Sequence, residues 1–160
     1  MTSTKLTIMA PVDGVIVPLN EVPDPVFAEG TLGDGLALDP LGDTLVAPCD
    51  GEVVQCARTA HAVTIRSEAG VEVLVHLGLD TVNLDGAGIE LCVTLGQHVS
   101  AGQTLLRFDP DRLAQSAMSL ITPIIITDEA GWRIVEHFSD RAGHQLRQGQ
   151  PLFVLAAAES

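Results

Sequence analysis

Basic and aromatic residues are scarce in this chain. Tyrosine is absent, tryptophan occurs once, phenylalanine occurs four times, and lysine plus arginine number only 8 of 160 residues. Aspartate plus glutamate number 21, so the formal net charge is -13. Because nucleic-acid-binding proteins use basic groups for phosphates and aromatic rings for bases, nucleic acid is not an expected partner. The acidic field could attract a basic protein, although an acidic surface more often serves solubility.

Lysine occurs once, as Lys5. The chain contains a Gly-x5-Gly-Gln pattern twice, which also occurs in biotinyl and lipoyl carrier modules. Those modules need a lysine at a hairpin tip, and this chain has none there. The same shortage excludes P-loop chemistry and Schiff-base lysine chemistry.

Cysteines are few and odd in number, and long apolar runs are absent. Cys49, Cys56 and Cys92 show no Cys-x-x-Cys spacing, and we expect three buried, inert thiols. The first ten residues contain no apolar stretch of signal-peptide length, and no run approaches 18 apolar residues. These features predict a cytoplasmic protein in a reducing compartment, with no direct membrane insertion.

Two pairs of segments in the chain have similar sequences, and each pair is called an echo below. Residues 10–17 resemble residues 47–54 through a shared Ala-Pro-x-Asp-Gly start, and residues 96–105 resemble residues 143–152 through two glycines six apart. Each echo is typical of a turn that leads into a strand. The pattern therefore indicates an internal duplication.

Short strands with glycine and proline between them predict an all-β fold, an antiparallel β-sandwich or barrel-like domain. One short helix is expected near residues 109–119, where Asp109 can cap it and Pro110 suits its first position. Length predicts a single domain over residues 1–160, with residues 156–160 as a linker or frayed end. The expected strands are residues 6–9, 14–19, 44–47, 52–57, 61–67, 71–77, 104–108, 121–127, 132–137 and 152–156.

His61 and His76 flank a run that predicts one β-hairpin. A tight turn centred between residues 68 and 69 would pair residues whose numbers sum to 137, placing the two histidines directly opposite each other. A three-residue loop with a bulge would instead give a sum of 138 and a diagonal contact. In either register the two imidazoles are expected to meet.

At this point the sequence resembles a known family, the glucose-type enzyme IIA component of the bacterial phosphoenolpyruvate-dependent sugar phosphotransferase system. The resemblance covers nearly the whole chain, and its motifs occur in order and in close register. The motifs are Ala10-Pro11 with Gly14, Val22-Pro23-Asp24-Pro25-Val26-Phe27-Ala28, Gly33-Asp34-Gly35, Ala47-Pro48 with Asp50-Gly51, His61-Ala62, Gly70-Val71-Glu72 and Val75-His76-Leu77-Gly78-Leu79-Asp80-Thr81-Val82.

The resemblance implies a phosphotransferase with a phosphohistidine intermediate and no cofactor. His76 would accept a phosphoryl group on Nε2 from the histidine-containing phosphocarrier protein and donate it to a cysteine of a sugar-specific enzyme IIB domain. The carbonyl group of Gly78 would fix the proton on Nδ1 of His76. His61 would hold the phosphoryl oxygens, and the hydroxyl group of Thr59 would orient His61. Donors aimed at the transferred oxygens are the main catalytic device in such reactions.

The resemblance also implies a docking rim. Asp80 and Asp24 match acidic positions that receive an arginine of the phosphocarrier, although alone they would be interpreted as turn or loop residues. Phe27 matches an apolar contact at the mouth of the site, and ordinary core packing is its alternative. Val26 and Leu74 are expected beside it as partner contacts. An apolar rim would shield the phosphohistidine from water and support transient docking.

A zinc site and a regulatory binding module are the two alternatives to phosphoryl transfer. Two opposed imidazoles can begin a zinc site, but position 78 is glycine, so a His-x-His ligand pair is missing and no metal site is expected. An open two-histidine site could still share a metal with a carboxylate of a partner. A regulatory binding module, switched by the charge that phosphorylation adds at His76, could coexist with transfer.

Overall fold

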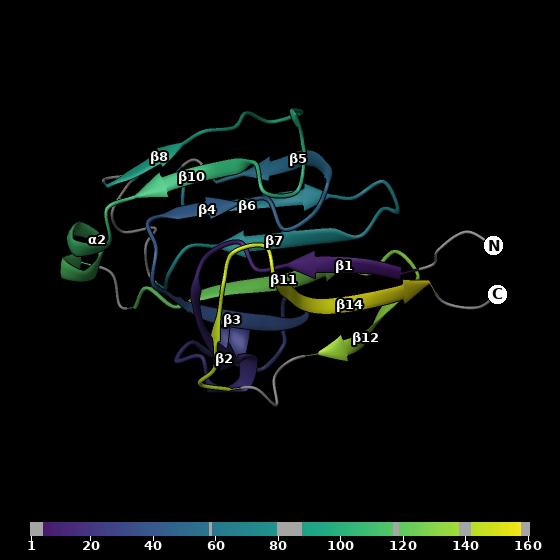
Figure 1. The fold of residues 1–160 in the computed structure, drawn as a ribbon, viewed down its shortest axis with the longest axis horizontal. Coiled ribbons are helices and arrows are strands. Elements are labelled where there is room, and N and C mark those ends of the chain that lie inside the picture. Colours follow the sequence, from purple (N-terminus) through teal and green to yellow (C-terminus); the bar gives the residue numbers. More distant parts are fainter. Residues whose placement is uncertain (1–4, 58, 80–87, 117–118, 138–141, 158–160) are drawn as a thin grey trace.

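Antiparallel strands make up most of the computed structural model, which describes residues 5–57, 59–79, 88–116, 119–137 and 142–157. Three sheets are formed by these residues (Figure 1). The large sheet has the order β13 (Gln145–Leu146), β2 (Gly14–Pro18), β3 (Asp34–Pro40), β11 (Thr122–Asp128), β7 (Glu72–His76), β6 (Ala62–Arg66), β5 (Gly51–Cys56) and β9 (His98–Val99). The small sheets are β1 (Lys5–Met9), β14 (Pro151–Ala157) and β12 (Trp132–His137), and β4 (Thr44–Val46), β10 (Thr104–Phe108) and β8 (Ile89–Leu91).

The predicted duplication is confirmed by matching hydrogen bonds at the two echoes. In the first copy of the Pro-x-Asp-Gly turn, Asp13 Oδ1 accepts a hydrogen bond of 2.6 Å from the backbone N–H group of Gln148. In the second copy, Asp50 Oδ1 accepts a hydrogen bond of 2.7 Å from the backbone N–H group of Ala101. Each aspartate thus joins one Pro-x-Asp-Gly turn to one of the glycine-flanked turns.

The two copies also bond to each other reciprocally. The N–H group of Met9 donates to the carbonyl group of Pro48, the N–H group of Val46 donates to that of Pro11, and both distances are 2.9 Å. The large sheet also consists of two corresponding halves. Counted inward from one edge, its strands are β13, β2, β3 and β11, and counted inward from the other edge they are β9, β5, β6 and β7. The two halves therefore meet between β11 and β7 at the centre of the sheet (Figure 1).

Side chains of β7 alternate between two apolar clusters because successive residues of a strand point to opposite faces. Val73, Val75 and Leu77 belong to the main core, which also contains side chains of both small sheets. Leu74 packs against a smaller cluster on the other face, and His76 shares that face with it. The smaller cluster consists of Leu19, Val22, Phe27, Ala37, Leu79 and Ile125.

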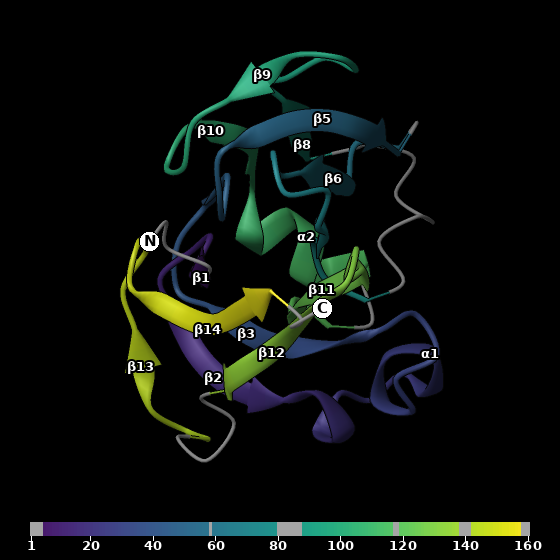
Figure 2. The ribbon, with the colours of Figure 1, turned by 90° about the vertical axis from the view of Figure 1, so that its right-hand side faces the viewer.

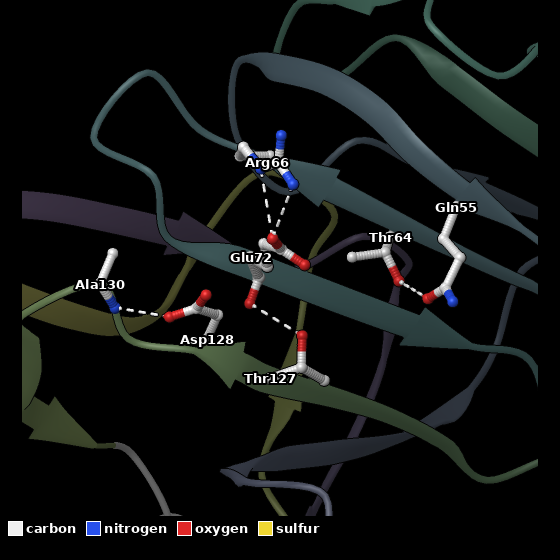
Figure 3. Close-up of polar contacts among 7 residues, drawn as sticks. All are labelled: Gln55, Thr64, Arg66, Glu72, Thr127, Asp128 and Ala130. Carbon is white, nitrogen blue, oxygen red and sulfur yellow. Dashed lines mark hydrogen bonds and ion pairs between the residues drawn. The ribbon is translucent and has the colours of Figure 1, made fainter.

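In the β6–β7 hairpin, the numbers of the two residues in each cross-strand pair sum to 138. Ala62 lies opposite His76, and Arg66 lies opposite Glu72. The three-residue loop from 68 to 70 ends at Gly70, whose φ of 90° suits glycine. Arg66 and Glu72 form an exposed ion pair of 3.0 Å at the loop end (Figure 3). The expectation of a sum of 137 was wrong, and the bulged alternative is confirmed.

Two short α-helices and one 3-10 helix accompany the strands in the described part of the chain. α2 (Pro110–Ser116) begins as predicted, since Asp109 Oδ1 accepts a hydrogen bond from the N–H group of Arg112. It does not reach Ser119, which pairs with Leu79 in an isolated bridge. The sequence did not predict η1 (Leu19–Glu21) and α1 (Pro25–Ala28), which lie beyond the end of β2 (Figure 2). None of the helices in the described ranges is long and apolar enough to cross a membrane.

All ten expected strands are present, and four further strands were missed: β3, β8, β9 and β13. At the carboxyl end, β14 extends through Ala157, so residues 156 and 157 of the expected linker are strand. The three cysteines are free, but only Cys49 is buried. Cys56 and Cys92 are half-buried, so the expectation of three buried thiols was wrong for these two. Burial, helped by the charge of Asp50, raises the pKa of Cys49 to about 12.

Candidate active site at the end of β7

His76 is the last residue of β7, and its ring is held by the backbone that follows. Nδ1 of His76 lies 2.9 Å from the carbonyl oxygen of Gly78. Since a carbonyl oxygen only accepts hydrogen bonds, the proton of a neutral ring is held on Nδ1. Gly78 has a φ of 68°, in the left-handed region that favours glycine. The turn therefore leaves Nε2 of His76 with a free lone pair.

The ring of His61 lies edge-on against the ring of His76. Their centroids are 4.8 Å apart and their planes are inclined by 79°. In a regular ladder His61 would point away from this face, because its neighbour Ala62 lies opposite His76. Before β6 the chain bends at Ala60, whose φ is 65°, and the bend allows the side chain of His61 to turn back toward His76. The hydroxyl group of Thr59 is hydrogen-bonded to Nδ1 of His61.

Burial keeps both imidazoles neutral. It lowers the pKa of His61 to about 4, and the neighbouring His76 contributes in the same direction. Burial also lowers the pKa of His76, against the opposing effects of the Gly78 carbonyl group and the negative charge of Asp24. At pH 7 the Nε2 atom of His76 is consequently an unprotonated nucleophile.

Phe27 and Asp24 belong to the short segment around α1 that covers one side of the site. The ring of Phe27 is buried and lies 5.0 Å from that of His76, with 60° between the planes. Asp24 caps α1 by accepting a hydrogen bond of 3.0 Å from the N–H group of Val26. Val26 itself is 47% exposed. This segment thus gives the site an apolar wall, an exposed apolar side chain and a nearby carboxylate.

A shallow cavity of about 200 Å³ lies on the same face of the sheet, along β5, β6 and β7. Ala62, directly opposite His76, and the half-buried Leu74, two residues before it, both line this cavity. Its other lining residues are Gln55, Cys56, Ala57 and Thr64, and the hydroxyl group of Thr64 donates to Gln55 Oε1 at 3.3 Å (Figure 3). The apolar surface therefore continues from the histidine pair across the face of the hairpin.

Known proteins are similar to this chain in sequence and in fold. Residues 6–131 match the family described as phosphoenolpyruvate-dependent sugar phosphotransferase system, EIIA 1. The chain belongs to this family. It is an enzyme IIA domain of this phosphotransferase system.

Individual relatives are similar over most of the enzyme IIA domain. The PTS system glucose-specific EIIA component of Bacillus cereus is 48% identical over 122 residues, which are 76% of this chain and 74% of the relative. The glucose-specific EIIBCA component of Corynebacterium glutamicum is 47% identical over 121 residues, which are 76% of this chain. The chain spans only 18% of the length of that longer relative. The solved structure of glucose permease IIA from Mycoplasma capricolum is 40% identical, with a TM-score of 0.88 over 94% of this chain and 95% of that one.

Most of the predicted site residues of the enzyme IIA domain lie together. The structure groups Thr59, His61, His76, Gly78, Asp24, Val26, Phe27 and Leu74 around the end of β7. Asp80, the remaining predicted rim residue, lies outside the described residues. Within the described ranges, no group of three His, Cys, Asp or Glu side chains is placed to hold a metal ion.

Two features of the site were missed by sequence reasoning. One is the left-handed conformation of Ala60, for which an alanine gives no signal. The other is Thr122, which contacts the Gly78 turn from 44 positions away. Of the other histidines, His98 and His144 are exposed, whereas His137 is half-buried, bonds the carbonyl oxygen of Gly35 at 2.8 Å and stacks on Phe153.

Proposed function

We propose that His76 is the residue of this enzyme IIA domain that carries the phosphoryl group. Its Nε2 lone pair attacks the phosphorus atom of the phosphocarrier's phosphohistidine, an N–P bond forms on His76, and the donor's N–P bond breaks. In the second step a thiolate of enzyme IIB attacks the same phosphorus atom and His76 leaves as a neutral imidazole. The observation that carries this proposal is the hydrogen bond from Nδ1 of His76 to the Gly78 carbonyl group, which keeps Nε2 free through both steps.

His61 is proposed to hold the phosphoryl oxygens. If the hydroxyl group of Thr59 donates to Nδ1 of His61, the proton of this neutral ring resides on Nε2 and can be donated to a phosphoryl oxygen. The edge-on packing of the two rings supports the role, since the ring of His61 lies against the ring that would receive phosphate. A preorganised donor at this position stabilises the charge of the transferred group.

The surface around the two histidines is proposed as the docking site for both protein partners. Asp24 and Asp80 would receive a basic side chain of the phosphocarrier, while Phe27, Val26 and Leu74 would provide apolar contact. The exposure of Val26 and the net charge of -13 support recognition of a basic partner with an apolar patch. We further propose that residues 1–160 act as one domain, on the cytoplasmic side of the membrane.

Phosphate transfer in a reconstituted system tests the roles of the histidines. Labelled phosphoenolpyruvate, enzyme I and the phosphocarrier should label the wild-type protein to about one phosphate per chain, and His76→Ala should remain unlabelled. His61→Gln should accept label but deliver it to enzyme IIB at least about tenfold more slowly. His144→Gln is the matched control because His144 is exposed in a distant turn, and it should behave as wild type. Full labelling of His76→Ala would disprove the assignment of the acceptor.

A further inference from the structure

The turn that holds His76 is itself bonded to a segment from the other half of the fold. This segment is residues 119–122, which leads into β11. The N–H group of Leu79 donates to the carbonyl oxygen of Ser119 at 2.8 Å, and the N–H group of Gly78 donates to Thr122 Oγ1 at 3.4 Å. The two peptide groups on either side of the Gly78 Cα atom are thus each fixed from outside β7.

Thr122 is fully buried, and its hydroxyl group is used twice. It donates to the carbonyl oxygen of Leu120 at 2.9 Å and accepts the hydrogen bond from Gly78. The donation to Leu120 commits the single hydroxyl proton, so Oγ1 presents a lone pair to the N–H group of Gly78. A chain of hydrogen bonds therefore runs from Leu120 through Thr122 to the Gly78 turn, whose carbonyl oxygen meets Nδ1 of His76.

We propose that Thr122 is a positioning residue for phosphoryl transfer, which holds the Gly78 turn so that its carbonyl oxygen keeps the proton of His76 on Nδ1. Without this hold, the glycine turn gains conformational freedom and the hydrogen bond to Nδ1 weakens. The competing tautomer carries its proton on Nε2, so this atom has no free lone pair with which to attack phosphorus. The inference rests on the proposed role of His76 as phosphoryl acceptor.

The variant that separates this role from simple packing is Thr122→Val, because valine has nearly the shape of threonine but no hydroxyl group. The control is Thr127→Val on the same strand. The hydroxyl group of Thr127 also contacts the β7 backbone, at the carbonyl oxygen of Glu72, but at the far end of the strand from His76 (Figure 3). Thr122→Ser keeps the hydroxyl group and serves as the rescue.

Two readouts are needed, the nitrogen-15 chemical shifts of the His76 ring and the rate of phosphorylation by the phosphocarrier. Wild type, Thr127→Val and Thr122→Ser should show the Nδ1–H tautomer and similar rates. Thr122→Val should show a substantial fraction of the Nε2–H tautomer and a kcat at least about tenfold lower, with KM for the phosphocarrier nearly unchanged.

A folded Thr122→Val protein with the wild-type tautomer and rate would overturn the inference. If this variant does not fold, Thr122→Ala gives the same decision, since it removes the hydroxyl group without adding a methyl group against the Gly78 backbone. Loss of the Nδ1–H tautomer in Thr122→Ser would also overturn it. A wild-type protein that is never phosphorylated on His76 would instead remove the proposed function, so the two failures are distinguishable.

Discussion

The buried ring of Phe27 packs against the ring of His76, with 5.0 Å between the two centroids. Phe27 belongs to the smaller apolar cluster, together with Ile125 of β11 and Leu79 of the turn after β7. The phenyl ring therefore joins the α1 segment to His76. An apolar group in this position would limit access of water to a phosphoryl group carried by His76.

Replacement of Phe27 by alanine should therefore affect both stability and the lifetime of the phosphorylated state. Loss of a buried phenyl ring lowers the free energy of unfolding by about 3 kcal/mol. The phosphohistidine should hydrolyse several-fold faster, because water reaches it through the space left by the ring. Denaturant titration measures the first effect, and release of labelled phosphate from isolated phosphoprotein measures the second.

Phe27→Leu is the matched control for this prediction. Leucine keeps an apolar side chain over His76, so its loss of stability should be smaller and its hydrolysis rate close to that of wild type. Equal hydrolysis rates in wild type and Phe27→Ala would show that the phenyl ring does not protect the phosphoryl group.

Ala60 and Ala130 provide a pair of positions with the same backbone property and different locations. Both have positive φ, 65° at Ala60 and 50° at Ala130, but only Ala60 adjoins His61. A β-branched side chain is strained in this conformation, so Ala60→Val and Ala130→Val should each lower the free energy of unfolding by about 1 kcal/mol or more. Only Ala60→Val should slow phosphoryl delivery to enzyme IIB, since it shifts the bend that turns His61 toward His76.

Denaturant titration and the rate of label transfer from phosphorylated protein to enzyme IIB check this prediction. Equal delivery rates in the two valine variants would mean that the bend at Ala60 does not position His61. A normal stability in both would contradict the strain argument itself.

Stability should depend on pH through His61. Its pKa is about 4 in the folded protein and near 6.5 in the unfolded chain, so between these values the unfolded chain binds a proton that the folded protein does not. The free energy of unfolding should therefore fall as pH decreases from about 7 toward 4. The difference between the two pKa values corresponds to roughly 3 kcal/mol at its largest.

His61→Gln lacks this titration, so its stability should fall less over the same pH range. The carboxylates are common to both proteins, and the difference between the two pH profiles of urea unfolding therefore isolates His61. His144→Gln is a suitable control because its histidine is exposed. Parallel profiles for wild type and His61→Gln would show that burial does not lower the pKa of His61.

The positions of strands along the chain were predictable where β-branched residues lie between turn residues. All ten expected strands have this composition, whereas β3 reads Asp-Gly-Leu-Ala-Leu-Asp-Pro and resembles a loop. Its place in the sheet comes from pairing with β2 and β11, which a local pattern does not encode. The missed strands β9 and β13 are two residues long and lie inside the repeated turns.

The histidine pair was predictable from spacing and motif, but its geometry was not. The residues between His61 and His76 allowed two registers, and the three-residue loop that ends at Gly70 decides between them. His61 directly follows an alanine in a conformation that alanine rarely adopts, which a local pattern does not reveal. The hydrogen bond from Gly78 to Thr122 forms only because β11 pairs with β7, which no local sequence pattern encodes.

Lys5 and Ala156 are paired neighbours in β1 and β14, so the two ends of the folded domain emerge side by side (Figure 1). Lys5 also lines a cavity with Ser67 and Ala69, at the loop end of the β6–β7 hairpin, whereas His76 lies at its opposite end. β7 alone separates these ends by roughly 13 Å. A protein joined to either terminus would be tethered away from His76, the proposed phosphoryl acceptor. Such a tether would raise the local concentration of a fused partner protein. It would also leave the surface around His76 open to a second partner that is not fused.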